Sequence, residues 1–122
     1  MQLTLEWSKF FNSFEEDKIK ENTPESPGIY LFWVKLTKGE WKCFFVGETS
    51  NLQKRILSHT KPTEKRICIS DRIKDKNCGY EFAIVEENSH REGIMTYLCD
   101  YYKPECSPDR QWGYPIFVNL PE

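Results

Sequence analysis

Two predicted strands and the turn between them occupy residues 28–47, GIYLFWVKLTKGEWKCFFVG. Ile29 to Leu36 is almost entirely apolar and rich in β-branched and aromatic residues, as expected for a central strand that is covered on both faces. The next four residues include Gly39 and suit a turn. Residues 41–46, WKCFFV, then return as the partner strand. The pattern predicts an antiparallel hairpin that begins with Gly-Ile-Tyr and ends with Phe-Val-Gly.

An amphipathic helix is predicted before the hairpin. Four large side chains, Trp7, Phe10, Phe11 and Phe14, follow the spacing i, i+3, i+4 and i+7 that places them on one helical face. The charged residues that follow would supply the wet side of this helix. Two prolines within residues 23–28 then end the helix and deliver the chain to the hairpin in extended form.

A second helix is predicted directly after the hairpin. Gly47 ends the strand, and either Ser50 or Asn51 is suited to cap a helix that runs to His59. At about 100° per residue, Arg55 and His59 lie side by side at the rim of the apolar stripe that faces the core. A charged group at this rim is held by packing and can still reach a ligand. An ordinary surface arginine with a packed stem would show the same spacing.

The second half of the chain predicts a third strand between less regular segments. Residues 64–76 fit either a short helix or an irregular connection. Residues 79–85 alternate in polarity, which suits a strand with one wetter face. In the C-terminal tail, only residues 115–118 are strand-like, and we expect them at a sheet edge.

A final helix is predicted from about His90 to Tyr102. Asn88 or Ser89 would cap it, and Pro104 would end it. Its predicted buried stripe consists of Ile94, Leu98 and Tyr101.

The 122 residues fit a single domain with one hydrophobic core. Its predicted parts are an N-terminal helix and linker (1–26), a core (27–107) and a C-terminal tail (108–122). No run of about 18 apolar residues occurs, and the N-terminus lacks the basic and then apolar layout of a signal peptide. We therefore expect a soluble, cytoplasmic protein without a membrane segment.

The five cysteines are expected to be reduced thiols with mostly structural roles. Their number is odd and they lack C-x-x-C pairing, so neither a disulfide framework nor a zinc site is favoured. The two histidines, His59 and His90, lie far apart in the sequence, which argues against a dedicated transition-metal site.

Positive charge is concentrated between residues 53 and 76 of a chain whose net charge is −2. This segment has eight basic and three acidic residues, whereas residues 77–122 carry a net charge of −5. A basic segment can steer a polyanion to one face, because salt screens the distant acids over about 8–10 Å. A solvated surface is the alternative explanation. The basic residues expected to contact nucleic acid are Lys54, Arg55, Lys61, Lys65 and Arg66.

The order of these motifs resembles the GIY-YIG nuclease superfamily over roughly residues 27–107. The resemblance implies an α/β (α+β) sandwich in which helices flank a central three-stranded antiparallel sheet. It also implies metal-assisted phosphodiester hydrolysis with Mg²⁺ or Mn²⁺. The matching residues are Gly28-Ile29-Tyr30, Phe45-Val46-Gly47, Arg55 and His59.

The resemblance assigns catalytic roles to four residues. Tyr30 would lie near the attacking water as general base or positioning group. Arg55 would bind the scissile phosphate, and His59 would order the water or the phosphate. Preorganised donors aimed at a developing oxyanion are usually the largest contribution to such catalysis. Phe45 stands where the second motif usually has tyrosine, so the ring is kept and a hydroxyl is lost.

The metal position departs most from the family pattern. Counting back from Pro104 places the family's metal-binding glutamate on Met95. A thioether is a soft, neutral ligand, whereas Mg²⁺ prefers hard, anionic oxygen. A displaced carboxylate, Glu92 or Glu48, is the candidate metal ligand, although both also fit ordinary helix and loop positions. Ser107 stands where the family carries an asparagine.

Three functions stay open on these grounds. In the first, the chain contacts nucleic-acid phosphates and Met95 makes metal-dependent hydrolysis doubtful. In the second, it is an active Mg²⁺- or Mn²⁺-dependent endonuclease that uses Glu92 or Glu48. In the third, it is a catalytically silent protein-interaction module. DNA is favoured over RNA as the partner, and a protein partner or a homo-oligomer is also open.

Overall fold

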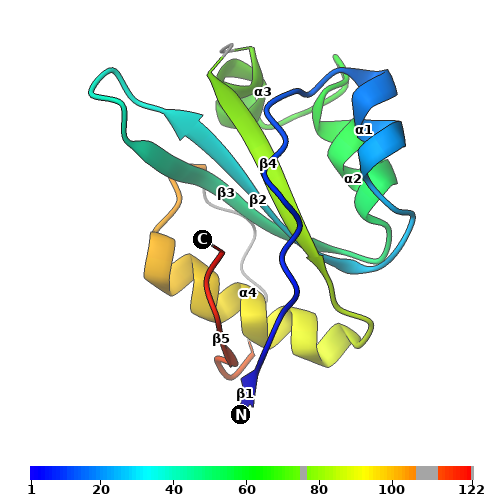
Figure 1. Cartoon of the computed structure of the whole chain (residues 1–122), viewed down its shortest axis with the longest axis vertical. Helices are drawn as coiled ribbons and strands as arrows, with labels where there is room; N and C mark the ends of the chain where they lie inside the picture. The colour runs from blue at the N-terminus through cyan, green and yellow to red at the C-terminus, as the bar shows by residue number, and fades with distance from the viewer. Residues whose placement is uncertain (75–76, 107–112, 122) are drawn as a thin grey trace.

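A computed structural model describes residues 1–74, 77–106 and 113–121. Its helices and strands are β1 (Gln2–Leu3), α1 (Glu16–Asn22), β2 (Gly28–Lys35), β3 (Trp41–Thr49), α2 (Leu52–His59), α3 (Ile67–Ile73), β4 (Cys78–Ile84), α4 (Asn88–Tyr102) and β5 (Phe117–Val118). The central element is an antiparallel sheet with strand order β3-β2-β4 (Figure 1). Helices α1, α2 and α3 pack on one face and α4 packs on the other. The predicted α/β fold class is confirmed.

The β2–β3 hairpin has the predicted strands and turn. Gly39 in the turn has a φ of +88°, in the left-handed region that glycine adopts without steric cost. β2 lies between two cores, which explains its continuous apolar sequence. Tyr30 and Phe32 belong to the core beneath α1, α2 and α3, whereas Ile29 and Leu31 belong to the core beneath α4.

Residues 7–14 are extended, so the helix predicted across them is wrong. Phe11 exchanges backbone hydrogen bonds of 2.9 and 2.8 Å with Tyr80 on β4. β4 is an edge strand whose outer N–H and C=O groups need partners, and the extended segment supplies them. Trp7 then packs against the α4 core and Phe11 against the opposite one. The aromatic residues of this segment therefore pack into two different cores and do not form one helical face.

β4 is covered on both faces, so the predicted wetter face is also wrong. The Glu81 side chain is only 6% exposed, although it carries a carboxylate. The cover comes from segments far apart in sequence, because residues 7–10 and 119–121 line a pocket together with Glu81. The alternation along β4 could not reveal this cover.

α4 buries Ile94 and Leu98 of the predicted stripe but not its third member. Tyr101 is 57% exposed, so it does not belong to the buried stripe. Glu87, instead of Asn88 or Ser89, is the N-cap residue, and it makes no side-chain cap bond. Asn88 is the first residue of the helix, and its side-chain oxygen accepts a hydrogen bond from Arg91, one turn later. The buried residues of α4 are Arg91, Gly93, Ile94, Met95 and Leu98.

The remaining segments resolve two open points. Residues 64–76 contain the helix α3, which was one of the two alternatives. The strand expected within residues 115–118 is β5, but it pairs in parallel with β1 and not with an edge of the main sheet. In the described parts of the chain, no helix has the length and apolar character that crossing a membrane requires.

Cys68 and Cys106 form a disulfide, so the expectation of five reduced thiols is wrong for this pair. The bond joins α3 to the segment after α4, across a sequence separation of 38. Cys106 is also held by a 2.8 Å hydrogen bond from its backbone N–H to the Phe44 carbonyl. Spacing alone could not show this pairing, because the two cysteines meet only after the sheet and helices have assembled.

We predict that Cys106→Ser lowers the free energy of unfolding by about 3 kcal/mol, because the disulfide restricts a long loop in the unfolded chain. Urea denaturation of the oxidised protein, with and without reductant, measures the effect. Cys99→Ser is the matched control, since Cys99 lies outside the disulfide and should keep the reductant-dependent shift of the parent. Equal denaturation midpoints for the oxidised and reduced parent would contradict the prediction.

Candidate functional site

Tyr30 lies on the face of the sheet that α2 covers, and it is 1% exposed. Its pairing partner on the neighbouring strand β3 is Gly47, where an added Cβ would lie 2.1 Å from Tyr30 Cζ. Real side chains do not tolerate such a distance, so only glycine lets the phenol ring lie across the β3 backbone. The glycine that ends the Phe-Val-Gly motif therefore fixes the position of the phenol.

His59, the last residue of α2, meets Tyr30 inside the core. Asn51 caps the helix as predicted, and its side chain accepts the Lys54 backbone N–H at 3.0 Å. His59 Nε2 lies 2.8 Å from Tyr30 Oη, and the imidazole packs edge-on against Phe45. At 1% exposure, His59 is buried and does not occupy the rim that helical spacing predicted.

Glu64 completes a hydrogen-bonded chain that sequence reasoning missed. Its Oε2 lies 2.5 Å from His59 Nδ1, and its Oε1 accepts the Arg66 backbone N–H at 2.9 Å. The connection after α2 has neither a helical nor a strand period, so nothing in the pattern placed this carboxylate. The one available clue was an acid five residues beyond a histidine that ends a helix.

At neutral pH the three hydrogen-bonded side chains are a charged Glu64, a neutral His59 and a protonated Tyr30. Burial lowers the pKa of His59, and the Glu64 carboxylate opposes that change. Burial acts to raise the pKa of Glu64, but hydrogen bonds from the Arg66 N–H and from His59 outweigh it and lower the pKa. Burial also raises the pKa of Tyr30, which Arg55 offsets only in part. His59 therefore donates from Nδ1 to Glu64 and accepts the Tyr30 hydroxyl proton at Nε2.

Two guanidinium groups lie beside these three hydrogen-bonded side chains. Arg55 is exposed on α2, and its guanidinium lies near enough to Tyr30 and His59 for its charge to lower the pKa of both. The charge of Arg66 acts on both groups in the same direction, and its guanidinium carbon lies 5.6 Å from the centroid of the Phe45 ring. The structure thus brings Tyr30, Arg55 and His59 together and places Phe45 in the same cluster of rings.

The predicted lysines differ in how much charge they present. Lys54 and Lys65 are exposed on α2 and on the connection that follows it. Lys61 is exposed as well, but its Nζ forms an ion pair with Glu16 on α1. Part of the Lys61 charge is therefore neutralised within the protein.

The residues at the predicted metal position do not converge on a cation site. Met95 is 6% exposed and packs in the core beneath α4, on the face of the sheet opposite the phenol. Glu48 Oε2 accepts a 3.0 Å hydrogen bond from Nε of the buried Arg91. Glu92 Oε1 accepts a longer one, 3.3 Å, from Asn88 Nδ2 on its own helix.

This donor set does not fit Mg²⁺ or Mn²⁺. Hard divalent cations take several oxygen ligands, whereas Met95 offers a thioether and the Glu48 carboxylate is already paired. Arg91 is held in place, because its Nη1 donates to two backbone carbonyls before α4 at 3.1 and 2.8 Å. Within the described ranges, no three His, Cys, Asp or Glu side chains group as a metal site. Ser107, the other departure from the family pattern, lies outside the described residues.

Two curated relatives match most of this chain, whereas no family model does. UvrABC system protein C from Aquifex aeolicus is 30% identical over 109 residues, which are 84% of this chain and 17% of that protein. UvrABC system protein C from Dictyoglomus thermophilum is 31% identical over 84 residues, which are 69% of this chain and 13% of that protein. The chain therefore spans only a small part of the length of the relatives it matches.

Solved structures share the fold. The GIY-YIG N-terminal endonuclease domain of UvrC from Thermotoga maritima, bound to its catalytic divalent cation magnesium, matches with a TM-score of 0.55 and 22% identity. The match covers 75% of this chain and 98% of that domain. A point mutant of the same domain, in which phenylalanine replaces a tyrosine, gives the same TM-score over 76% of this chain. The described sheet and helices thus correspond to nearly all of the solved domain.

We predict that the free energy of unfolding falls as the pH drops from about 7 to about 5. The folded-state pKa of His59 lies below its ordinary value of 6.5, so the unfolded chain binds more protons than the folded one in this range. The stability that a neutral His59 provides above pH 6.5 is therefore lost on acidification. His59→Gln should be less stable at pH 7 and should show a flatter pH dependence.

Urea denaturation at each pH gives the free energies for this comparison. His90→Gln is the matched control, because His90 is the other histidine of the chain and its side chain is 27% exposed on α4. It should keep the pH dependence of the parent. Curves for the parent and His59→Gln that run in parallel would show that His59 is not the group responsible.

Proposed function

This chain is a GIY-YIG domain, and we propose that it binds nucleic-acid phosphates at Arg55 and Arg66 without hydrolysing them efficiently. The observation that carries the proposal is the position of these two guanidinium groups beside the buried Tyr30–His59 pair. An anion that reached this surface would meet the positive charges of Arg55 and Arg66. It would not meet a free carboxylate, because Glu64 is bonded to His59.

Arg55 has the chemistry for the main phosphate contact. A guanidinium group is planar and presents donors that match two phosphate oxygens at once. The Tyr30 hydroxyl donates to His59, so its oxygen keeps lone pairs that favour the nearby positive charge of Arg55. A buried phenol with a raised pKa stays protonated at neutral pH and is poorly suited to be a general base. Tyr30 and His59 therefore act as positioning residues in this proposal.

The surroundings suit a polyanion more than a single phosphate. Lys54 and Lys65 extend the basic surface beside the two arginines, and further phosphates along a strand would meet them. The solved structures of similar fold are described as an endonuclease domain, which supports a nucleic-acid partner. We propose DNA in preference to RNA.

Location and assembly stay predictions. A cytoplasmic location is the one that the sequence favours, whereas the Cys68–Cys106 disulfide is more typical of an oxidising compartment. A protein partner or a homo-oligomer also stays a prediction.

An active enzyme that uses Glu48 or Glu92 is the alternative function. Glu48 is close enough for its charge to raise the pKa of Tyr30, but Arg91 is paired with the same carboxylate. Glu92 lies on α4 and bonds within that helix. Binding is therefore favoured over metal-dependent cleavage.

Arg55→Ala is expected to weaken DNA binding several-fold and to reduce the slope of log affinity against log salt by about 1, because one phosphate contact is lost. Fluorescence anisotropy with labelled single-stranded and duplex DNA over a range of salt concentrations measures both quantities. RNA of the same sequence, run in parallel, tests the preference for DNA.

Lys38→Ala is the matched control for this experiment. Lys38 is an exposed cation in the β2–β3 turn, so its loss changes the net charge equally and leaves the site intact. Its affinity should remain within about twofold of the parent, as expected for a distant screened charge. A parent chain that shows no salt-dependent binding, or equal losses in both variants, would reject the phosphate site.

Supercoiled plasmid is expected to remain uncut by the parent chain in Mg²⁺ or Mn²⁺, because the residues present do not fit such a cation. Agarose-gel nicking assays with Glu48→Gln and Glu92→Gln alongside make the measurement. Nicking by the parent that either substitution abolishes would establish the alternative, an active enzyme. A folded Met95→Glu variant that nicks plasmid would instead identify the missing carboxylate as the cause of inactivity.

A further inference from the structure

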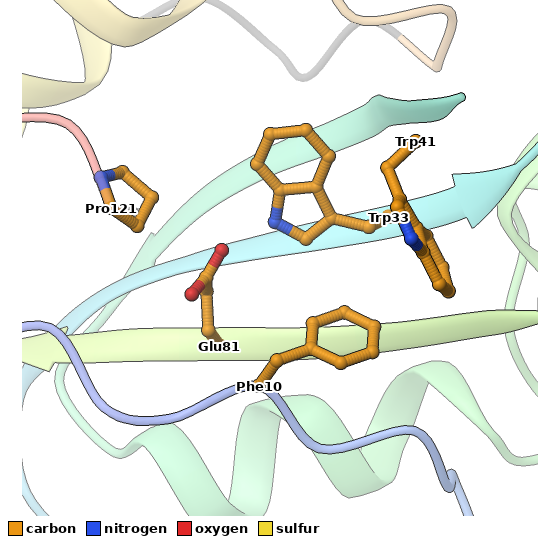
Figure 2. A pocket seen from close by; sticks show the side chains of 5 residues that line it. All are labelled: Phe10, Trp33, Trp41, Glu81 and Pro121. Carbon is orange, nitrogen blue, oxygen red and sulfur yellow. The ribbon is translucent and has the colours of Figure 1, made fainter. Parts of the chain in front are cut away.

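A second pocket lies on the face of the sheet that carries α4, away from Tyr30 and His59. Figure 2 shows its lining, with the Glu81 carboxylate pointing into a space between aromatic rings. Its volume of about 290 Å³ suits a small ligand or a single side chain of a larger one. The lining residues are Phe10, Trp33, Trp41, Glu81 and Pro121.

Among the described residues, Glu81 is a buried acid without a paired cation. Its side chain is 6% exposed, and none of the ion pairs in the described parts of the chain includes it. Lys9 lines the adjoining pocket that Glu81 shares, but its Nζ lies over the Phe11 ring, 5.5 Å from the centroid. Burying a carboxylate without a partner is costly, and burial raises its pKa. A positive ligand group would remove that cost.

Trp33 provides a second polar group that is open to a ligand. Its Nε1 is buried and makes no hydrogen bond within the described parts of the chain. Figure 2 shows the indole nitrogen on the side of the ring that faces Glu81, and its approach offsets only part of the effect of burial on the pKa of that carboxyl. Native proteins rarely leave such a donor unsatisfied. The acceptor nearest to it in the pocket is the Glu81 carboxylate, and a ligand acceptor placed in the same space would also meet this N–H.

The aromatic rings of the pocket do not form a slot for a flat ligand. Phe10 and Trp41 meet at 64° with centroids 4.9 Å apart, so they do not form parallel walls that could sandwich a base. Tyr102 packs edge-on against Trp33, with an interplanar angle of 82° and ring centroids 5.3 Å apart. The ring faces that no neighbouring ring covers carry the negative potential that attracts a positive group, as in the aromatic cages that hold methylated ammonium ions.

We propose that this pocket binds a methylated ammonium group, with Glu81 as counter-ion and Trp33, Trp41 and Phe10 as the cage. The charge of the ligand neutralises the buried carboxylate, and its methyl groups contact the rings. An acceptor atom close to the ammonium group, such as the hydroxyl of choline, would satisfy the Trp33 N–H. This proposal is independent of phosphate binding, because its residues lie on the other face of the sheet.

Choline and its uncharged carbon analogue, dimethylbutanol, form the decisive pair of probes. They have nearly the same shape and differ in charge, so only a cation site distinguishes them. The indole N–H resonances of Trp33 and Trp41 in a nitrogen–proton correlation spectrum report binding at the pocket. We expect choline to shift both resonances in a saturable way and to bind about tenfold or more tightly than dimethylbutanol. A short peptide that carries trimethyl-lysine, compared with choline, separates a protein-borne source from a free small molecule.

Two substitutions test the named residues. Glu81→Gln keeps the shape of the side chain and should lower choline affinity at least tenfold, with Glu25→Gln, at an exposed linker position, as the control that should not. Trp41→Leu should weaken binding similarly, and it should leave the fold intact because Trp41 is 45% exposed. Equal binding of both probes, or choline binding that survives both substitutions, would overturn the proposal. Trp33 and Trp41 shifts that respond to nucleosides but not to choline would overturn it as well.

Discussion

The buried hydrogen-bonded chain from Glu64 through His59 to Tyr30 fixes the side of the molecule that faces α2. Each of its groups is almost inaccessible to water, so each needs a partner inside the protein. The chain supplies those partners by joining β2, the end of α2 and the connection after it. These contacts depend on Gly47, since any side chain there would displace the phenol. Local fold and candidate site therefore rest on one arrangement of polar atoms.

The elements that sequence predicted well are those whose structure is set by neighbours along the chain. Ile29 and its neighbours read as a doubly covered strand because both faces are apolar, and Asn51 was recognisable as a cap because capping is local. The rings between Trp7 and Phe14 misled because their spacing also fits an extended segment that serves two cores. The extended form is favoured because it pairs with the outer edge of β4, and no local sequence pattern shows that this edge needs a partner.

The residues of the candidate site also divide into those set by local sequence and those set by long-range contacts. The motif spacing anticipated that Tyr30, Arg55 and His59 would meet, since all three lie on regular elements next to the hairpin. Glu64 was not foreseen, because its position depends on an irregular connection. Arg91 was not foreseen as the partner of Glu48, because the two come from different elements 43 residues apart. Long-range polar pairs of this kind become visible only when the sheet is assembled.

The two faces of the sheet carry groups of opposite charge. On the α2 face the buried acid is bonded to His59, and Arg55 is exposed to solvent, so that face suits an anion. On the α4 face the acid of β4 has no cation partner among the described residues and aromatic rings surround it, so that face suits a positive group. A charged group is retained against its desolvation only when something compensates it. Because the intervening strands separate the two surfaces, an anion on the α2 face and a positive group on the α4 face would not compete for the same space.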